Sequence, residues 1–215
     1  MENKPRLPLP EPRNYGDVFN LAAEQLASIN DIEEQCRKSD TLYRLRDSQP
    51  EIIIQYLNRP YLLTVFDAKV ALMDSVEEVP LRDRILILHY FISAKGTPAA
   101  NKSITFRELP EGSVYFPTFA RRTVKPLLDR FAKEPHLLIE VGEKLGGRKA
   151  DYGDTAVTIN AFSRVPITII LWQGDDELSA QGNILFDATI ADYLPTEDIT
   201  VLCEVITWKL IRSLG

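Results

Sequence analysis

One histidine stands among apolar residues, where an imidazole could bind a cofactor. His89 lies four residues after Ile85 and three before Ile92, so the three side chains share one face of a predicted helix. A buried imidazole needs a hydrogen-bond partner, or it can ligate a metal through one nitrogen. The only other histidine is His136, so three histidine ligands are excluded. His89 is therefore a candidate axial ligand of a tetrapyrrole (haem or corrinoid), and the alternative is a hydrogen-bonded core residue.

Basic and aromatic side chains occur together after residue 114. Arg121 and Lys125 share a helix face at a spacing of four, and Tyr115 lies in the same segment. Arginine beside aromatic walls suits a flat ligand that carries carboxylates or phosphates. We expect such a ligand in a cleft lined by the C-terminal third, where it stacks on Tyr115 or Trp172 and pairs with Arg121 or Arg148. The alternative is a solvated helix face that pairs with acidic residues.

Three aspartates in the C-terminal third are candidate metal ligands. Asp154, Asp175 and Asp187 each follow or precede a predicted strand, and carboxylates are the ligands that Mg²⁺ and Ca²⁺ prefer. Together with a divalent ion they would make a hydrolase or transferase. Short acidic side chains also bind local backbone amides in turns and caps, so the alternative is a structural role.

Composition excludes several classes of protein. The net charge of −6 without a basic stripe argues against a nucleic-acid binder. Two separate cysteines, Cys36 and Cys203, fit a reducing compartment and exclude a cysteine-rich cluster built from this chain alone. The N-terminal residues do not predict an export signal, and no apolar run approaches the roughly 20 residues that span a bilayer. We expect a cytoplasmic protein that does not contact a membrane.

Strand patterns come in clusters along the chain and do not strictly alternate with helical patterns. Strands are predicted at 52–57, 61–66, 70–73, 104–109, 155–159, 167–172 and 182–186. Helices are predicted at 17–28, at 32–38 with Asn30 as cap, at 81–94, from Pro117 to Gly146 with interruptions at Pro126 and Pro135, and at 196–213. Clustered strands predict an α+β fold, in which a largely antiparallel sheet packs with several helices.

The length of the chain predicts one domain. Residues 14–215 are enough for a single core without disulfides or metals. Residues 1–13 contain four prolines with charges between them, which predicts a flexible, proline-rich arm.

The C-terminal part resembles a known family. The run from Trp172 to Glu177 (Trp-Gln-Gly-Asp-Asp-Glu) and the Leu-Phe-Asp run that ends at Asp187 are its most specific elements. Here the chain resembles an uncharacterised family of domains of unknown function, associated with anaerobic bacteria and archaea, from about residue 80 to the end. Some relatives carry an added cysteine-rich iron–sulfur segment, which this chain lacks.

These observations support a non-catalytic protein that binds a small ligand or cofactor, of which a tetrapyrrole binder is the most concrete version. The metal-dependent hydrolase or transferase is one alternative. A protein-interaction module with an unidentified partner protein is the other.

Overall fold

The computed structural model describes residues 15–214, so the predicted arm at 1–13 lies outside the described residues. The α-helices are α1 (Tyr15–Ala27), α2 (Ile32–Ser39), α3 (Leu81–Ser93), α4 (Gly112–Arg122), α5 (Val124–Phe131), α6 (His136–Lys144) and α7 (Thr196–Arg212). The strands are β1 (Leu42–Arg46), β2 (Gln49–Tyr56), β3 (Arg59–Thr64), β4 (Lys69–Leu72), β5 (Ser103–Thr105), β6 (Arg148–Lys149), β7 (Thr155–Phe162), β8 (Val165–Trp172) and β9 (Gln181–Asp187). Short 3-10 turns cover Phe106–Glu108 and Ile190–Asp192.

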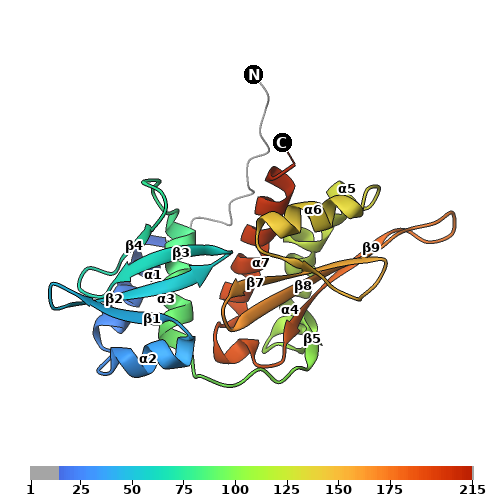
Figure 1. Ribbon diagram of the computed structural model, residues 1–215. Coiled ribbons are helices and arrows are strands. Elements are labelled where there is room, and N and C mark those ends of the chain that lie inside the picture. The colour runs from blue at the N-terminus through green and yellow to red at the C-terminus, as the bar shows by residue number, and fades with distance from the viewer. Residues whose placement is uncertain (1–14, 215) are drawn as a thin grey trace.

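The strands of residues 15–214 form one nine-stranded sheet in which every pairing is antiparallel. Its order is β4-β3-β2-β7-β8-β9-β5, with β1 paired to β2 and β6 to β7. The fold is therefore the predicted single α+β domain. Figure 1 shows two halves: α1–α3 accompany β1–β4, and α4–α7 accompany β5–β9.

The two halves of the sheet meet at one residue pair. Tyr56 of β2 pairs with Phe162 of β7, whereas β7 and β8 are paired along most of their length. Aromatic rings strengthen this junction, because Phe162 stacks on Tyr90 of α3 with ring centroids 4.1 Å apart. The buried apolar side chains of both halves form one continuous core across it.

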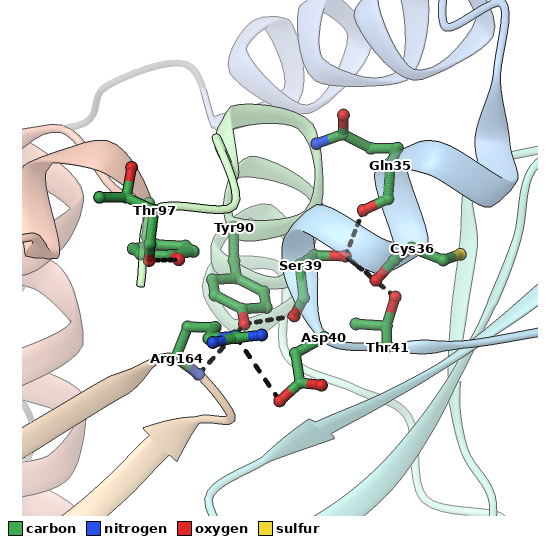
Figure 2. A network of polar contacts seen from close by, with 9 residues as sticks. Gln35, Cys36, Ser39, Asp40, Thr41, Tyr90, Thr97 and Arg164 are labelled. Atoms are coloured by element: carbon green, nitrogen blue, oxygen red, sulfur yellow. Dashed lines mark hydrogen bonds and ion pairs between the residues drawn. The ribbon is translucent and has the colours of Figure 1, made fainter. Parts of the chain in front are cut away.

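A polar network also crosses the junction (Figure 2). The buried Tyr90 hydroxyl donates to the Ser39 carbonyl at the end of α2 (2.6 Å) and accepts from the Arg164 amide between β7 and β8 (3.3 Å). The Arg164 side chain lies 3.7 Å from the Asp40 carboxylate. Burial raises the pKa of Tyr90, so its hydroxyl stays a donor at neutral pH.

Most of the predicted elements are present, but three predictions of local structure were wrong and one strand was missed. Asp31, not Asn30, caps α2, because its carboxylate accepts the Glu34 amide at 2.8 Å. The predicted strand 104–109 ends at Thr105, since Glu108 accepts from the Thr105 amide and so closes a turn. Helix α4 begins at Gly112 and contains Pro117 in its interior. Strand β1 had not been predicted at all.

Within residues 15–214, no helix is both long and apolar enough to cross a membrane.

Candidate functional site

His89 is held by a carboxylate from the far end of the sequence. Its Nδ1 lies 2.6 Å from Oδ2 of Asp198, and the two side chains are 21% and 10% exposed. Helix α3 positions His89, and the first turn of α7 positions Asp198. An ionised carboxylate only accepts hydrogen bonds, so Nδ1 is the donor. In the neutral imidazole, Nε2 then carries the lone pair and is the nitrogen left for another partner.

His89 and Asp198 both line a pocket of about 590 Å³, which we call the helical pocket. Helices α1, α3, α4 and α7 form it, so both halves of the molecule contribute to its wall. Ile85 and Leu86 of α3 and Phe119 of α4 give the wall a buried apolar part. The volume lies in the range that proteins use for small ligands.

Arg82 lies about two turns before His89 on the same face of α3 and also lines the helical pocket. Its Nη2 is 3.2 Å from Oε2 of Glu204 in α7, with side chains 14% and 0% exposed. Nε and Nη2 of Arg82 and both carboxylate oxygens of Glu204 are buried without a hydrogen-bond partner among the described residues. Arg82 and Glu204 therefore attract each other as an ion pair, but their buried donors and acceptors do not form hydrogen bonds.

Helix α4 presents Arg122, not Arg121, to the helical pocket. Arg122 follows the buried Phe119 by three residues and so faces the same way, whereas Arg121 is exposed and does not line the pocket. Tyr115, the other candidate from this segment, lines the pocket and is exposed.

The remaining two ligand-contact candidates do not line the helical pocket. Arg148 lies in the exposed strand β6, which pairs with β7. Trp172 ends β8 and is 39% exposed. Of the five ligand-contact residues predicted from the sequence, the structure thus brings His89 and Tyr115 to one pocket. The C-terminal third, predicted to line the cleft, contributes α7 to this pocket, and the other walls come from α1, α3 and α4.

The three candidate metal ligands bind backbone amides near them. Asp154 accepts from the Gln173 amide at 2.8 Å, and Asp175 accepts from the Leu178 amide at 2.7 Å. Asp187 accepts from the Asn101 amide at 2.8 Å. The Asp175 contact closes a local turn, whereas those of Asp154 and Asp187 join segments 19 and 86 residues apart in the sequence. Among residues 15–214, no group of three or more His, Cys, Asp or Glu side chains is arranged to hold a metal ion.

Hydrogen bonds set the charge of two of these aspartates. The amides of Leu178 and Glu177 lower the pKa of Asp175. Burial alone would raise the pKa of Asp187, but hydrogen bonds from Thr189, Ala100 and Asn101 lower it. Both side chains are therefore ionised at neutral pH and serve as acceptors.

Asp198, Arg82 and Arg122 had not been identified from the sequence. Asp198 is 109 residues from His89, and nothing local relates the two. For Arg82 and Arg122 a signal existed: Arg82 stands three residues before Ile85, and Arg122 stands three after Phe119. Both spacings place a charged residue on an apolar helix face.

A family model described as "Domain of unknown function (DUF3786)" matches residues 31–208. The chain therefore belongs to this family, and the match extends further towards the N-terminus than the resemblance read from about residue 80. No curated protein and no solved structure matches the chain.

Proposed function

We propose that this member of the family of unknown function is a non-catalytic binding protein, which holds a small ligand or cofactor in the helical pocket. One observation carries the proposal: His89 has one ring nitrogen bound to Asp198 while the ring lines a pocket of about 590 Å³. A core histidine that served packing alone would not need to border a pocket of ligand size.

The Asp198–His89 pair favours a ligand that contacts Nε2. Histidines that ligate metals generally donate their other ring N–H to a carboxylate, which fixes the ring and raises its basicity. One histidine suffices as an axial ligand where a macrocycle supplies the equatorial ligands. A tetrapyrrole, haem or corrinoid, is therefore the most concrete ligand. A cytoplasmic location and an occurrence in anaerobes accompany this proposal as expectations.

The test is a titration of the purified protein with haem and with a corrinoid, followed by absorption spectroscopy. The wild type is expected to bind one of them with a shifted absorption band. His89→Ala should abolish the shift with circular dichroism unchanged, and Asp198→Asn should weaken binding about 10–100-fold, as loss of such a carboxylate does. His136→Ala is the matched control, since His136 is exposed on α6 and does not line the pocket.

Two results would count against this version. A wild type that binds neither macrocycle ends the tetrapyrrole proposal. A spectral shift that persists unchanged in His89→Ala shows that the ligand lies elsewhere.

A further inference from the structure

We infer that Arg82 and Arg122 form an anion subsite in the helical pocket, which takes a carboxylate or phosphate group of the ligand. The inference rests on the proposed function and adds the chemical class of the ligand: an apolar, aromatic body with at least one acidic group.

Arg82 contributes donors that the protein does not use. A guanidinium has five N–H donors in a planar fork. In Arg82, Nε and Nη2 are buried without a hydrogen-bond partner among the described residues, and the one ion pair there is with Glu204. These two nitrogens are closed off from the pocket, as are both unsatisfied carboxylate oxygens of Glu204. Arg82 therefore offers a ligand its remaining nitrogen, Nη1, and its positive charge.

Arg122 contributes a positive charge without a counter-ion. Its side chain is half-buried in the wall of the helical pocket. Within residues 15–214, neither an ion pair nor a hydrogen bond engages its guanidinium. A guanidinium that lines a pocket without an acidic partner has its N–H donors free for a carboxylate or phosphate.

The acidic residues near the two arginines do not compensate both. Glu204 pairs with Arg82, and Asp198 is bound to His89. Glu111 and Glu197 line the helical pocket but are exposed to solvent, where water screens their charge. Arg122 is therefore the arginine of the pocket wall whose charge no described carboxylate pairs with.

The walls define the rest of the ligand. Ile85, Leu86 and Phe119 are buried apolar residues beside the arginines, and Tyr115 adds an aromatic ring. An aromatic body would pack on these side chains while its acidic group reaches the guanidinium groups.

The experiment compares three probes that share one ring system, 1-naphthoate, 1-naphthyl phosphate and the neutral 1-naphthamide, by isothermal titration calorimetry at constant ionic strength. Wild type should bind at least one of the two anions about tenfold more tightly than the amide, as expected for a charge-assisted hydrogen bond. Which anion binds more tightly distinguishes a carboxylate ligand from a phosphate ligand.

Variants locate the effect. Arg122→Gln should remove most of the preference for the anion and leave the affinity for the amide unchanged. Arg121→Gln is the matched control, because the neighbouring side chain is exposed and outside the pocket. For Arg82 the double variant Arg82→Met/Glu204→Met removes both charges of the buried pair, a change that proteins often tolerate, and it should also lower the preference.

If the wild type binds the anions and the amide with equal affinity, the inference is overturned, while the proposed ligand pocket still stands. The same follows if Arg121→Gln loses as much of the preference for the anion as Arg122→Gln does. If none of the three probes binds, the anion subsite is also overturned. The macrocycle titration then decides the proposed function separately, since it depends on His89.

Discussion

What each polar side chain of the helical pocket can offer a ligand depends on its hydrogen-bond and ion-pair partners within the protein. Asp198 fixes one nitrogen of His89 and thereby orients the other, a role that neither residue has alone. Glu204 pairs with Arg82 in the wall of the pocket, which buries two charges. Arg122 has no such support within the described chain, so its charge is the most available to a ligand. His89, Arg82 and Arg122 thus differ in how much each can contribute to the binding of a ligand.

Asp187 gives a prediction for a residue whose role is structural. Its carboxylate accepts from the amides of Ala100, Asn101 and Thr189, at 2.8–3.0 Å, and so ties the loop before β5 to the end of β9. Asp187→Asn is expected to lower the free energy of unfolding by about 1 kcal/mol, the typical size of a cap, since the side chain is half exposed. Urea denaturation measures this, with Asp175→Asn, in an exposed hairpin end, as the milder control.

The difference in free energy of unfolding between the wild type and Asp187→Asn should depend on pH in one direction. The pKa of Asp187 is lowered in the folded state, so its contribution is complete above the unfolded pKa, about 3.9. It is lost as the pH falls towards the folded pKa. The gap between wild type and Asp187→Asn should therefore be constant near pH 7 and shrink below about pH 4. A gap that widened on acidification would contradict this assignment.

At the scale of elements, the prediction from sequence succeeded where a pattern was long and regular. The apolar residues of α7 recur at three and four, and Ile199, Leu202, Ile206 and Leu210 are all buried. Strand β1 (Leu-Tyr-Arg-Leu-Arg) gives no clear strand pattern, because its apolar residues do not alternate with polar ones and none of its side chains is buried. The sequence predicts that α4 begins at Pro117, because proline is common at the first position of a helix. The helix in fact begins at Gly112 and continues through this proline.

The residues of the helical pocket were harder to predict from the sequence than the helices and strands. His89 and Tyr115 were found because each has a local signature, a polar or aromatic residue on a helix. Their convergence in one pocket depends on how α3, α4 and α7 pack, which local pattern does not determine. The same holds for Asp198, whose acidic side chain in a first helical turn is explained equally well by the helix dipole.

A buried contact between β2 and α3 supplies the prediction at this scale. The Tyr56 hydroxyl donates to Oδ1 of Asp83 at 2.7 Å, and both side chains are buried. Burial, then the charge of Asp83, raises the pKa of Tyr56, so the phenol remains a donor. Tyr56→Phe leaves the carboxylate of Asp83 with one donor fewer, and a loss of about 1–3 kcal/mol is expected.

Thermal and urea unfolding of Tyr56→Phe test this, with Tyr61→Phe as the matched control. The Tyr61 ring is buried on β3, but no hydrogen bond of its hydroxyl occurs within residues 15–214. Its loss should change stability little. Equal effects in the two variants would show that the hydroxyl of Tyr56 contributes nothing beyond ring packing.

For the whole molecule, the question is how tightly the two halves are coupled. The sheet links them through one residue pair, yet the apolar core is continuous and the helical pocket takes its walls from both. A ligand in that pocket would bind both halves at once and should stabilise the whole domain, because it binds only the folded state.

Phe162 is the residue through which this coupling can be tested. It forms the sheet pair with Tyr56, stacks on that ring with centroids 4.9 Å apart, and stacks on Tyr90 of α3. We expect the wild type to unfold in one transition, with equal calorimetric and van't Hoff enthalpies, since one core spans both halves. Phe162→Ala should cost about 3–5 kcal/mol, as removal of a buried phenylalanine does.

Differential scanning calorimetry of wild type, Phe162→Ala and a control, Phe66→Ala, measures both quantities. Phe66 is 85% exposed, so its removal should leave the melting temperature almost unchanged. If the core couples the halves beyond the junction, Phe162→Ala melts earlier but still in one transition. Two separate transitions in the wild type would mean that residues before and after the 94–102 connection fold independently, and that a ligand in the helical pocket joins two domains instead of filling one.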